Sequence, residues 1–200
     1  PLAIPMISEL RITPESVADL LVQRGYFEAI TYSFVDPSLQ GVLCPGEAAL
    51  ALANPISADL AQMRVSLWPG LVRALIENQR RQQGRVRLFE IGRKFRLDQG
   101  SLTEIGAVAG IAAGPTLPEQ WGTPASAVDF HDVRSDVEAL LRQNGTLASF
   151  EFAPAQHAAE EQPPERGRDR YPAQFDGVGA GAQAHAAELD PGQALEARRI

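Results

Sequence analysis

The sequence predicts an α+β fold in which an antiparallel sheet is flanked by helices. Segments with the two-residue alternation of strands follow segments of helical periodicity along the chain. Several neighbouring strands are separated only by turns, and such short connections favour antiparallel pairing over a doubly wound parallel sheet. The 200 residues, of which 44% are hydrophobic and 22% charged, are enough for a sizeable core.

The N-terminal part of the chain begins with residues 1–12, an extended lead-in that we assign to an upstream domain. A helix follows, because Thr13 can cap it, Pro14 suits its first turn and Gly25 can end it. One face of this helix carries apolar residues at helical spacing: Val17, Leu20 and Leu21. An apolar face of this kind packs on its own sheet or on a partner.

The middle of the chain alternates between short strands and helices. Residues 30–34 predict a half-buried strand, because Ile30, Tyr32 and Phe34 alternate with polar residues. A short helix is expected from Asp36, a brief strand at 63–65, and a helix from Ser66 to about Gln83. Two further strands are predicted at 86–95 and 105–113, with a turn at 98–100.

The C-terminal part is less regular. A helix is expected from Asp129 to Asn144, followed by a strand in which Phe150 and Phe152 alternate. Residues 161–200 contain only six large apolar side chains and are therefore expected to be poorly ordered.

Charge is distributed unevenly. The net charge of -7 argues against the whole domain being a nonspecific nucleic-acid binder. Between Arg73 and Arg96, however, eight basic residues accompany two acidic ones, so this basic belt carries +6 and the remainder -13. Its guanidinium groups could neutralise RNA phosphates, pair with an acidic partner or face solvent. The candidates for RNA contact are Arg80, Arg81, Arg85 and Arg87.

The cysteine, histidine, acidic and tryptophan residues form no recognisable catalytic, metal-binding or base-stacking site. Cys44 is the only cysteine, which excludes an internal disulfide and fits a reducing cytoplasm. His131 and Asp132 are adjacent and diverge on a helix, and no fourth metal ligand is found near them. Trp68 and Trp121 lack the basic and aromatic neighbours of a base-stacking site, so core or subunit contact is expected for both. We predict no catalytic residue and no metal ligand.

The sequence shows neither a membrane span nor a signal peptide. No run of 18 apolar residues could span a membrane, and the N-terminus has no signal-peptide layout. Because the sequence does not begin with methionine, we expect it to be a piece of a longer protein.

Three ordered segments resemble the beta subunit of bacterial phenylalanyl-tRNA synthetase. A weaker match continues through residues 128–134 (VDFHDVR), and the resemblance covers about 13–157. The three segments are 24–37 (RGYFEAITYSFVDP), then 54–57 (NPIS) with 63–71 (MRVSLWPGL), and then 78–82 (NQRRQ) with 85–95 (RVRLFEIGRKF).

The resemblance implies a fold like the core of class II aminoacyl-tRNA synthetases over residues 13–157. It implies that the alpha subunit binds phenylalanine, ATP and magnesium. The beta core, in contrast, would lack catalytic residues and cofactors. It would pack against alpha in a cytoplasmic alpha-two, beta-two heterotetramer that attaches phenylalanine to its tRNA. The residues expected at the subunit interface are Val17, Leu20, Leu21, Tyr32, Phe34 and Trp68.

After His157 the sequence departs from the family pattern. Residues 158–200 are assigned to a divergent C-terminal part of the same domain. Because the similarity ends abruptly, we hypothesise a frameshift near residues 158–162, which reading the encoding DNA in the other two frames would test.

Two other functions stay open at this stage. An active class II-like ligase paralogue would need arginines that hold ATP phosphates, and Arg96 near Asp98 is the nearest candidate. No glycine-rich strand with a second arginine accompanies it. The other alternative is a module that docks tRNA through the basic belt.

Overall fold

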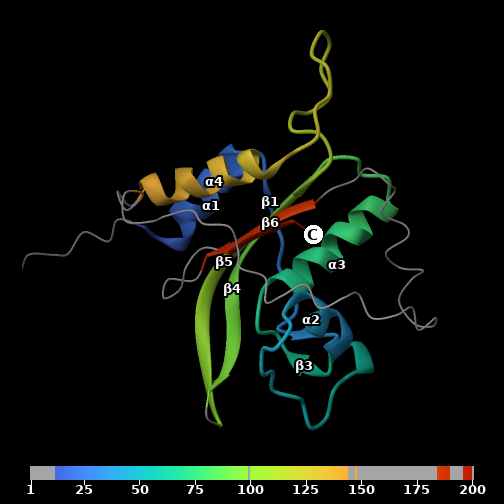
Figure 1. The fold of residues 1–200 in the computed structure, drawn as a ribbon, viewed down its shortest axis with the longest axis vertical. Coiled ribbons are helices and arrows are strands. Elements are labelled where there is room, and N and C mark those ends of the chain that lie inside the picture. The colour runs from blue at the N-terminus through green and yellow to red at the C-terminus, as the bar shows by residue number, and fades with distance from the viewer. Residues whose placement is uncertain (1–11, 99, 144–146, 148–183, 190–195, 200) are drawn as a thin grey trace, which may run out of the picture.

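A computed structural model describes residues 12–98, 100–143, 147, 184–189 and 196–199 (Figure 1). The helices are α1 (Pro14–Gln23), α2 (Pro37–Leu43), the 3-10 turn η1 (Ala58–Leu60), α3 (Trp68–Arg80) and α4 (Phe130–Gln143). The strands are β1 (Phe27–Glu28), β2 (Phe34–Val35), β3 (Gln62–Met63), β4 (Val86–Asp98), β5 (Ser101–Ala113), β6 (Ala184–Leu189) and β7 (Glu196–Arg199). The predicted α+β class is confirmed.

The main sheet has the strand order β1-β4-β5-β6-β7, and β2 pairs with β3 in a small second sheet. The expectation of a wholly antiparallel sheet is wrong at one edge, where β1 runs parallel to β4 with Phe27 opposite Leu88. The long connection that contains α2 and α3 makes this parallel pair feasible. The other pairs of the sheet are antiparallel.

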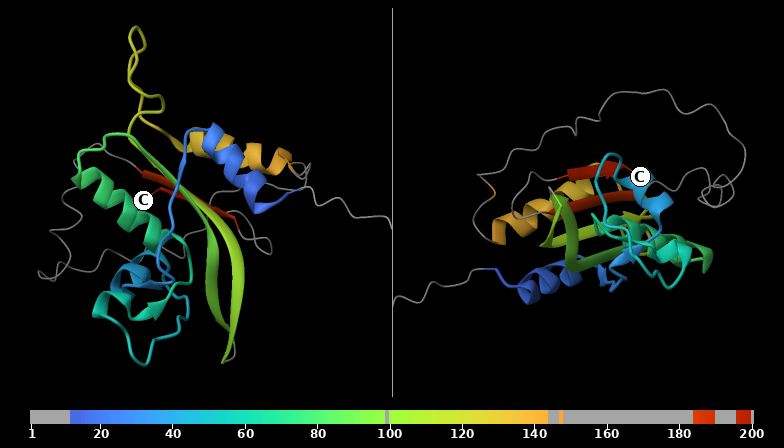
Figure 2. Two further views of the ribbon diagram at one scale, coloured as in Figure 1. Left: turned by 180° about the vertical axis from the view of Figure 1, so that it is seen from behind. Right: turned by 90° about the horizontal axis from the view of Figure 1, so that it is seen from below.

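Helices cover both faces of the main sheet. Helix α3 packs on one face, and α1 and α4 lie together on the other (Figures 1 and 2). The alternation of side chains along β5 serves both layers: Ile111 packs with α3, whereas Ala112 packs with α1 and α4. Both layers therefore contribute a hydrophobic core, and the central strands are buried between them.

Strands β4 and β5 form a long hairpin of two 13-residue strands. This confirms the strands predicted at 86–95 and 105–113, which are longer than expected. The hairpin extends past the rest of the sheet, because β6 pairs only with residues 108–113 and β1 only with residues 88–89 (Figure 1).

The predicted helices are also confirmed. Thr13 and Ser16 form a reciprocal capping box at the start of α1. The amides of His131 and Asp132 donate to the Asp129 carboxylate at the start of α4. The strand predicted at Phe150 and Phe152 lies outside the described residues. Strands β6 and β7 fall where the low apolar content gave no signal for a strand.

One glycine of the loop after β5 is held against another part of the backbone. Gly114 has a φ of +87°, and a Cβ there would lie 1.9 Å from the Gly84 carbonyl oxygen. Gly122 has a φ of +83°, but a Cβ there would meet nothing within 4 Å. An added side chain would therefore cause backbone strain at both positions, but steric overlap only at Gly114.

We predict that Gly114→Ala lowers the free energy of unfolding by at least about 2 kcal/mol, because backbone strain and overpacking each cost at least about 1 kcal/mol. Gly122→Ala should cost about 1–2 kcal/mol, from strain alone. Urea denaturation of both variants measures the difference. Equal losses would show that the Gly84–Gly114 contact is not constrained.

Candidate subunit interface

The edge segment, residues 29–33, places its two large apolar side chains outward. Ile30 is 90% exposed and Tyr32 is 73% exposed, whereas Ala29 packs against the core beneath α3. The strand predicted at 30–34 is wrong: only Phe34 of that range belongs to a strand, β2. The alternation is nevertheless present: Ala29 and Thr31 face inward, and Ile30 and Tyr32 face outward.

Thr31 points inward because it joins a buried ion pair. The Arg64 guanidinium lies 2.7 Å from the Glu90 carboxylate, and both side chains are 4% exposed. The Thr31 hydroxyl donates to Glu90 at 2.7 Å and accepts from Arg64 at 3.0 Å. The Thr31 amide also donates to Glu90, at 3.3 Å. These bonds occupy the backbone group that a continuous strand would use, and they turn Ile30 and Tyr32 toward solvent.

Gly70 allows this arrangement. A Cβ at Gly70 would lie 2.1 Å from the Thr31 hydroxyl oxygen, so only glycine lets the edge segment approach the first turn of α3. The approach leaves an open cavity of about 350 Å³ between the edge segment, α2 and α3. Apolar side chains dominate its wall, and Arg73 and Glu77 lie among its lining residues. An exposed apolar edge next to a cavity can accept a side chain from another protein.

The residues predicted for a subunit interface separate into two groups. Leu21 is 4% exposed and packs with α4, and Val17 and Leu20 pack partly buried against the same cluster. Trp68 is 2% exposed in the core beneath α3. Their apolar surface is thus used within the chain. Tyr32 and Phe34 line the cavity of the edge segment, together with Ile30, which we had not predicted for the interface. Contact with a partner stays a prediction for the whole set.

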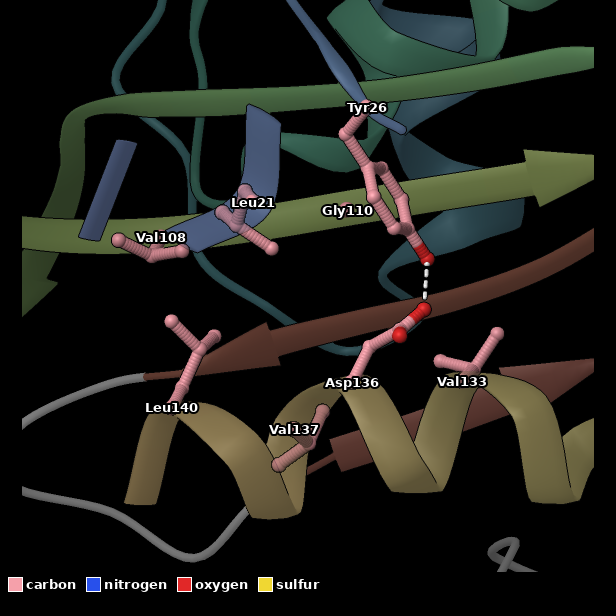
Figure 3. A pocket seen from close by; sticks show the side chains of 8 residues that line it. All are labelled: Leu21, Tyr26, Val108, Gly110, Val133, Asp136, Val137 and Leu140. Atoms are coloured by element: carbon pink, nitrogen blue, oxygen red, sulfur yellow. Dashed lines mark hydrogen bonds between the residues drawn. The ribbon is translucent and has the colours of Figure 1, made fainter. Parts of the chain in front are cut away.

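A second buried polar cluster centres on Asp136 of α4. The Tyr26 hydroxyl donates to the Asp136 carboxylate at 2.6 Å (Figure 3). The Arg87 guanidinium, 6% exposed, donates to Asp136 at 3.3 Å, and Arg24 donates to the other carboxylate oxygen. The cluster ties α4 to β4 and to the end of α1. Its sequence signal is one acidic residue, Asp136, between the apolar residues Val133 and Val137 of α4.

Burial and the neighbouring charge of Asp136 raise the pKa of Tyr26 far above its ordinary value of 10. The folded state therefore holds the phenol proton more tightly than the unfolded state does. The protonated Tyr26 phenol therefore stabilises the folded state fully below pH 10, and this contribution is lost as the pH rises above 10.

We predict that the free energy of unfolding falls by up to about 1.4 kcal/mol between pH 10 and pH 11 because of this one group. In Tyr26→Phe that part of the pH dependence should be absent, whereas Tyr32→Phe, at an exposed site, should leave it intact. Urea titrations at a series of pH values measure the slope. An unchanged slope in Tyr26→Phe would contradict the burial of the phenol.

The basic belt is divided by the fold. Arg80 is exposed and pairs with Glu77 at 3.0 Å, and Arg81 is exposed next to it. Arg87 is buried on Asp136, and Arg85 is half-buried, where it donates to the Thr116 carbonyl at 3.2 Å. Burial and the neighbouring Arg87 lower the pKa of Arg85. RNA contact stays a prediction for all four, of which Arg80 and Arg81 are the exposed ones.

Three arginines line an open cavity of about 290 Å³: Arg24, Arg85 and Arg87. Two of them pair with Asp136, which also lines the cavity together with Asp132. Two carboxylates thus lie beside the arginines of this cavity, and their negative charge would repel the phosphates of a nucleoside triphosphate. Arg96, the candidate from the sequence, lies on β4 and does not line this cavity.

Within the described residues, no group of three or more histidine, cysteine or acidic residues could hold a metal ion. Cys44 is half-buried and forms no disulfide, since it is the only cysteine of the sequence. In the same parts of the chain, no helix has both the length and the apolar character that crossing a bilayer requires.

Comparison with known proteins places the chain among synthetase subunits. Residues 5–162 match the family model described as the phenylalanyl tRNA synthetase beta chain CLM domain. The phenylalanine–tRNA ligase beta subunit of Pseudomonas putida is 54% identical over 140 residues, covering 70% of this chain and 18% of that protein. The beta subunit of Methylococcus capsulatus is 50% identical over 152 residues, covering 76% and 19%. The chain thus spans about a fifth of the length of these relatives. A solved pyrrolysyl-tRNA synthetase from Desulfitobacterium hafniense has a TM-score of 0.46 at 21% identity, covering 66% of this chain and 45% of that chain.

Proposed function

We propose, from the premise that this chain belongs to the phenylalanyl-tRNA synthetase beta chain family, that it is a structural and interaction module of a beta subunit. In this proposal the module has the fold of a class II synthetase core but no catalytic role. It supports an alpha subunit that binds phenylalanine, ATP and magnesium and attaches phenylalanine to its tRNA. The assembly is an alpha-two, beta-two heterotetramer in the cytoplasm.

The observation that carries the proposal is the edge segment. Ile30 and Tyr32 are held outward by the Thr31–Glu90–Arg64 bonds, so the apolar surface is a built feature of the fold. The cavity beside them offers space for a side chain of the partner. The carboxylates among the arginines of the second cavity favour a structural role for that cluster over ATP binding.

The exposed edge permits a direct test with little risk to folding. Ile30→Asp and Tyr32→Asp change exposed side chains and should leave the melting temperature nearly unchanged. Both should weaken binding of a purified alpha subunit at least about tenfold, because a charge replaces an apolar contact. Ile56→Asp is the matched control, since Ile56 is 86% exposed but does not line the cavity.

Titration calorimetry of the 200-residue chain with the alpha subunit measures these affinities. Wild-type affinity in Ile30→Asp and Tyr32→Asp would reject the edge segment as the interface. Phenylalanine-dependent pyrophosphate exchange by the chain alone would reject the non-catalytic role and favour an active paralogue.

The docking of tRNA through the basic belt is less well supported. The four candidate arginines, Arg80, Arg81, Arg85 and Arg87, do not share a surface, because Arg87 is buried in an ion pair with Asp136. Loss of low-salt tRNA binding on Arg80→Glu with Arg81→Glu would favour it, and no binding at low salt would eliminate it.

A further inference from the structure

Among the described residues, Trp121 has the most exposed large apolar side chain. Its whole surface is open to solvent. A tryptophan carries a large apolar surface that folded proteins seldom leave fully in water. It lies on residues 115–129, here called the Trp121 arm, which rises from the end of β5 away from the sheet and helices (Figure 1). Leu117 on the same arm is 51% exposed. The arm therefore presents apolar surface at a site remote from its own core.

The base of the Trp121 arm is firmly attached to the fold. Pro115 pairs with Ala127 in an antiparallel bridge, and the Thr116 amide donates to the Ser126 carbonyl at 2.8 Å. Below this pair, the Val128 amide donates to the Gly114 carbonyl at 2.9 Å. A base held in this way reduces the conformational entropy that the arm would lose on binding.

Side chains of the core hold the same base. Arg85 and Arg87 donate to the Thr116 carbonyl at 3.2 and 3.4 Å, and the Thr116 hydroxyl donates to Asp132 at 3.2 Å. Arg87 is itself fixed by Asp136. The Asp136 cluster thus connects the packing of α4 to the position of the arm.

The composition of the arm favours a protein partner over a nucleic acid. Residues 115–129 contain Glu119 and Asp129 but no lysine or arginine. Aromatic side chains that stack on bases are accompanied by basic groups that attract the phosphates, and this arm would repel them. Tryptophan is, in contrast, enriched among the residues that dominate the affinity of protein–protein contacts.

We propose that the Trp121 arm is a docking element that inserts Trp121 into an apolar pocket of the alpha subunit, with basic groups of that subunit facing Glu119. This inference rests on the proposed function and adds a second contact site to it. The arm lies beyond the C-terminal end of α3, where Gly114 meets Gly84. The cavity of the edge segment instead borders the residues Pro69 to Glu77 of α3. An alpha subunit that binds at both sites would span the length of this helix.

The two tryptophans of the chain make a specific measurement possible. Labelling the full 200-residue chain with 5-fluorotryptophan gives one fluorine resonance for buried Trp68 and one for exposed Trp121, assigned with Trp121→Phe. In the free chain, the Trp121 resonance should shift between H₂O and D₂O, and the Trp68 resonance should not. Saturation with unlabelled alpha subunit should abolish the solvent shift of Trp121. Transfer RNA alone should leave it unchanged.

The affinity for the alpha subunit provides a second readout. Trp121→Ala should weaken binding by about 10- to 100-fold, the range of a residue that dominates an interface. Gln120→Ala, a neighbour on the same arm, is the matched control and should have no effect. Because the Trp121 side chain is fully exposed, both variants should melt like the wild type.

Each other outcome overturns the inference. A Trp121 resonance that is protected in the free chain, or that responds to tRNA alone, would assign the arm to the chain itself or to RNA. Binding of alpha that leaves the Trp121 solvent shift intact, while Ile30→Asp still weakens that binding, would reject the arm and preserve the proposed function. Failure of alpha to bind the wild-type chain at all would reject both.

Discussion

Replacement of Glu90 by alanine is expected to lower the free energy of unfolding by about 3–5 kcal/mol. The loss is large because Glu90 is the carboxylate partner of Arg64, and both side chains are 4% exposed. Without Glu90 the guanidinium would stay buried with an uncompensated charge. Thr31 would lose the acceptor of both its amide and its hydroxyl, so the edge segment would also lose its fixed position.

Two comparisons make this prediction specific. Glu77→Ala removes the partner of Arg80 in an exposed pair and should cost no more than about 1 kcal/mol. The double variant Glu90→Ala with Arg64→Met should be more stable than Glu90→Ala alone, because no buried charge remains. Urea denaturation measures all three. A loss below about 1 kcal/mol in Glu90→Ala would mean that water reaches Arg64 in the folded chain.

Asp136→Ala is the second change with a large expected effect, again about 3–5 kcal/mol. It removes the charge that compensates buried Arg87 and the acceptor of the Tyr26 hydroxyl. Asp136→Asn keeps the size of the side chain and one acceptor oxygen, so it should cost less than the alanine variant. Thermal and urea denaturation give the two values.

A partly exposed pair on the same helix provides the control. Arg134→Ala removes an i,i+4 contact with Glu138 on the surface of α4 and should cost at most about 0.5 kcal/mol. Equal losses in Asp136→Ala and Arg134→Ala would contradict a structural role for the Asp136 cluster. If the Trp121 arm depends on this cluster, Asp136→Asn should also broaden the fluorine resonance of Trp121.

The long elements of the fold could be predicted because their signals are local. The helix after Thr13, the helix from Asp129 and the strands at 86–95 and 105–113 each carry the periodicity and end signals that define them. The direction of β1 could not be predicted, since it depends on a partner strand far along the sequence. Residues 30–34 were predicted as a half-buried strand, because Ile30, Tyr32 and Phe34 alternate with polar residues. The deciding interaction was the bond from Thr31 to Glu90, which periodicity does not contain.

The family could be recognised from the sequence, whereas the candidate site could only be reached in part. Three ordered segments between residues 24 and 95 gave the family that the match over residues 5–162 confirms. Tyr32 and Phe34 were selected and do line the cavity, but Ile30 was not. Arg87 was grouped with exposed arginines, because charge counted along the chain cannot tell a guanidinium inside the core from one in water.

The position of Arg64 also affects how this chain behaves among other copies of itself. Beyond the two residues of β1, the outer edge of β4 would offer free amide and carbonyl groups to a foreign strand. The Arg64 carbonyl accepts from the Phe95 amide at 2.9 Å, and its guanidinium donates to the Arg93 carbonyl at 2.8 Å. Edges blocked in this way resist the strand-by-strand growth that leads to aggregation. Arg64 thus covers the part of the β4 edge that lies beyond β1, whereas Ile30 and Tyr32 of the edge segment stay exposed.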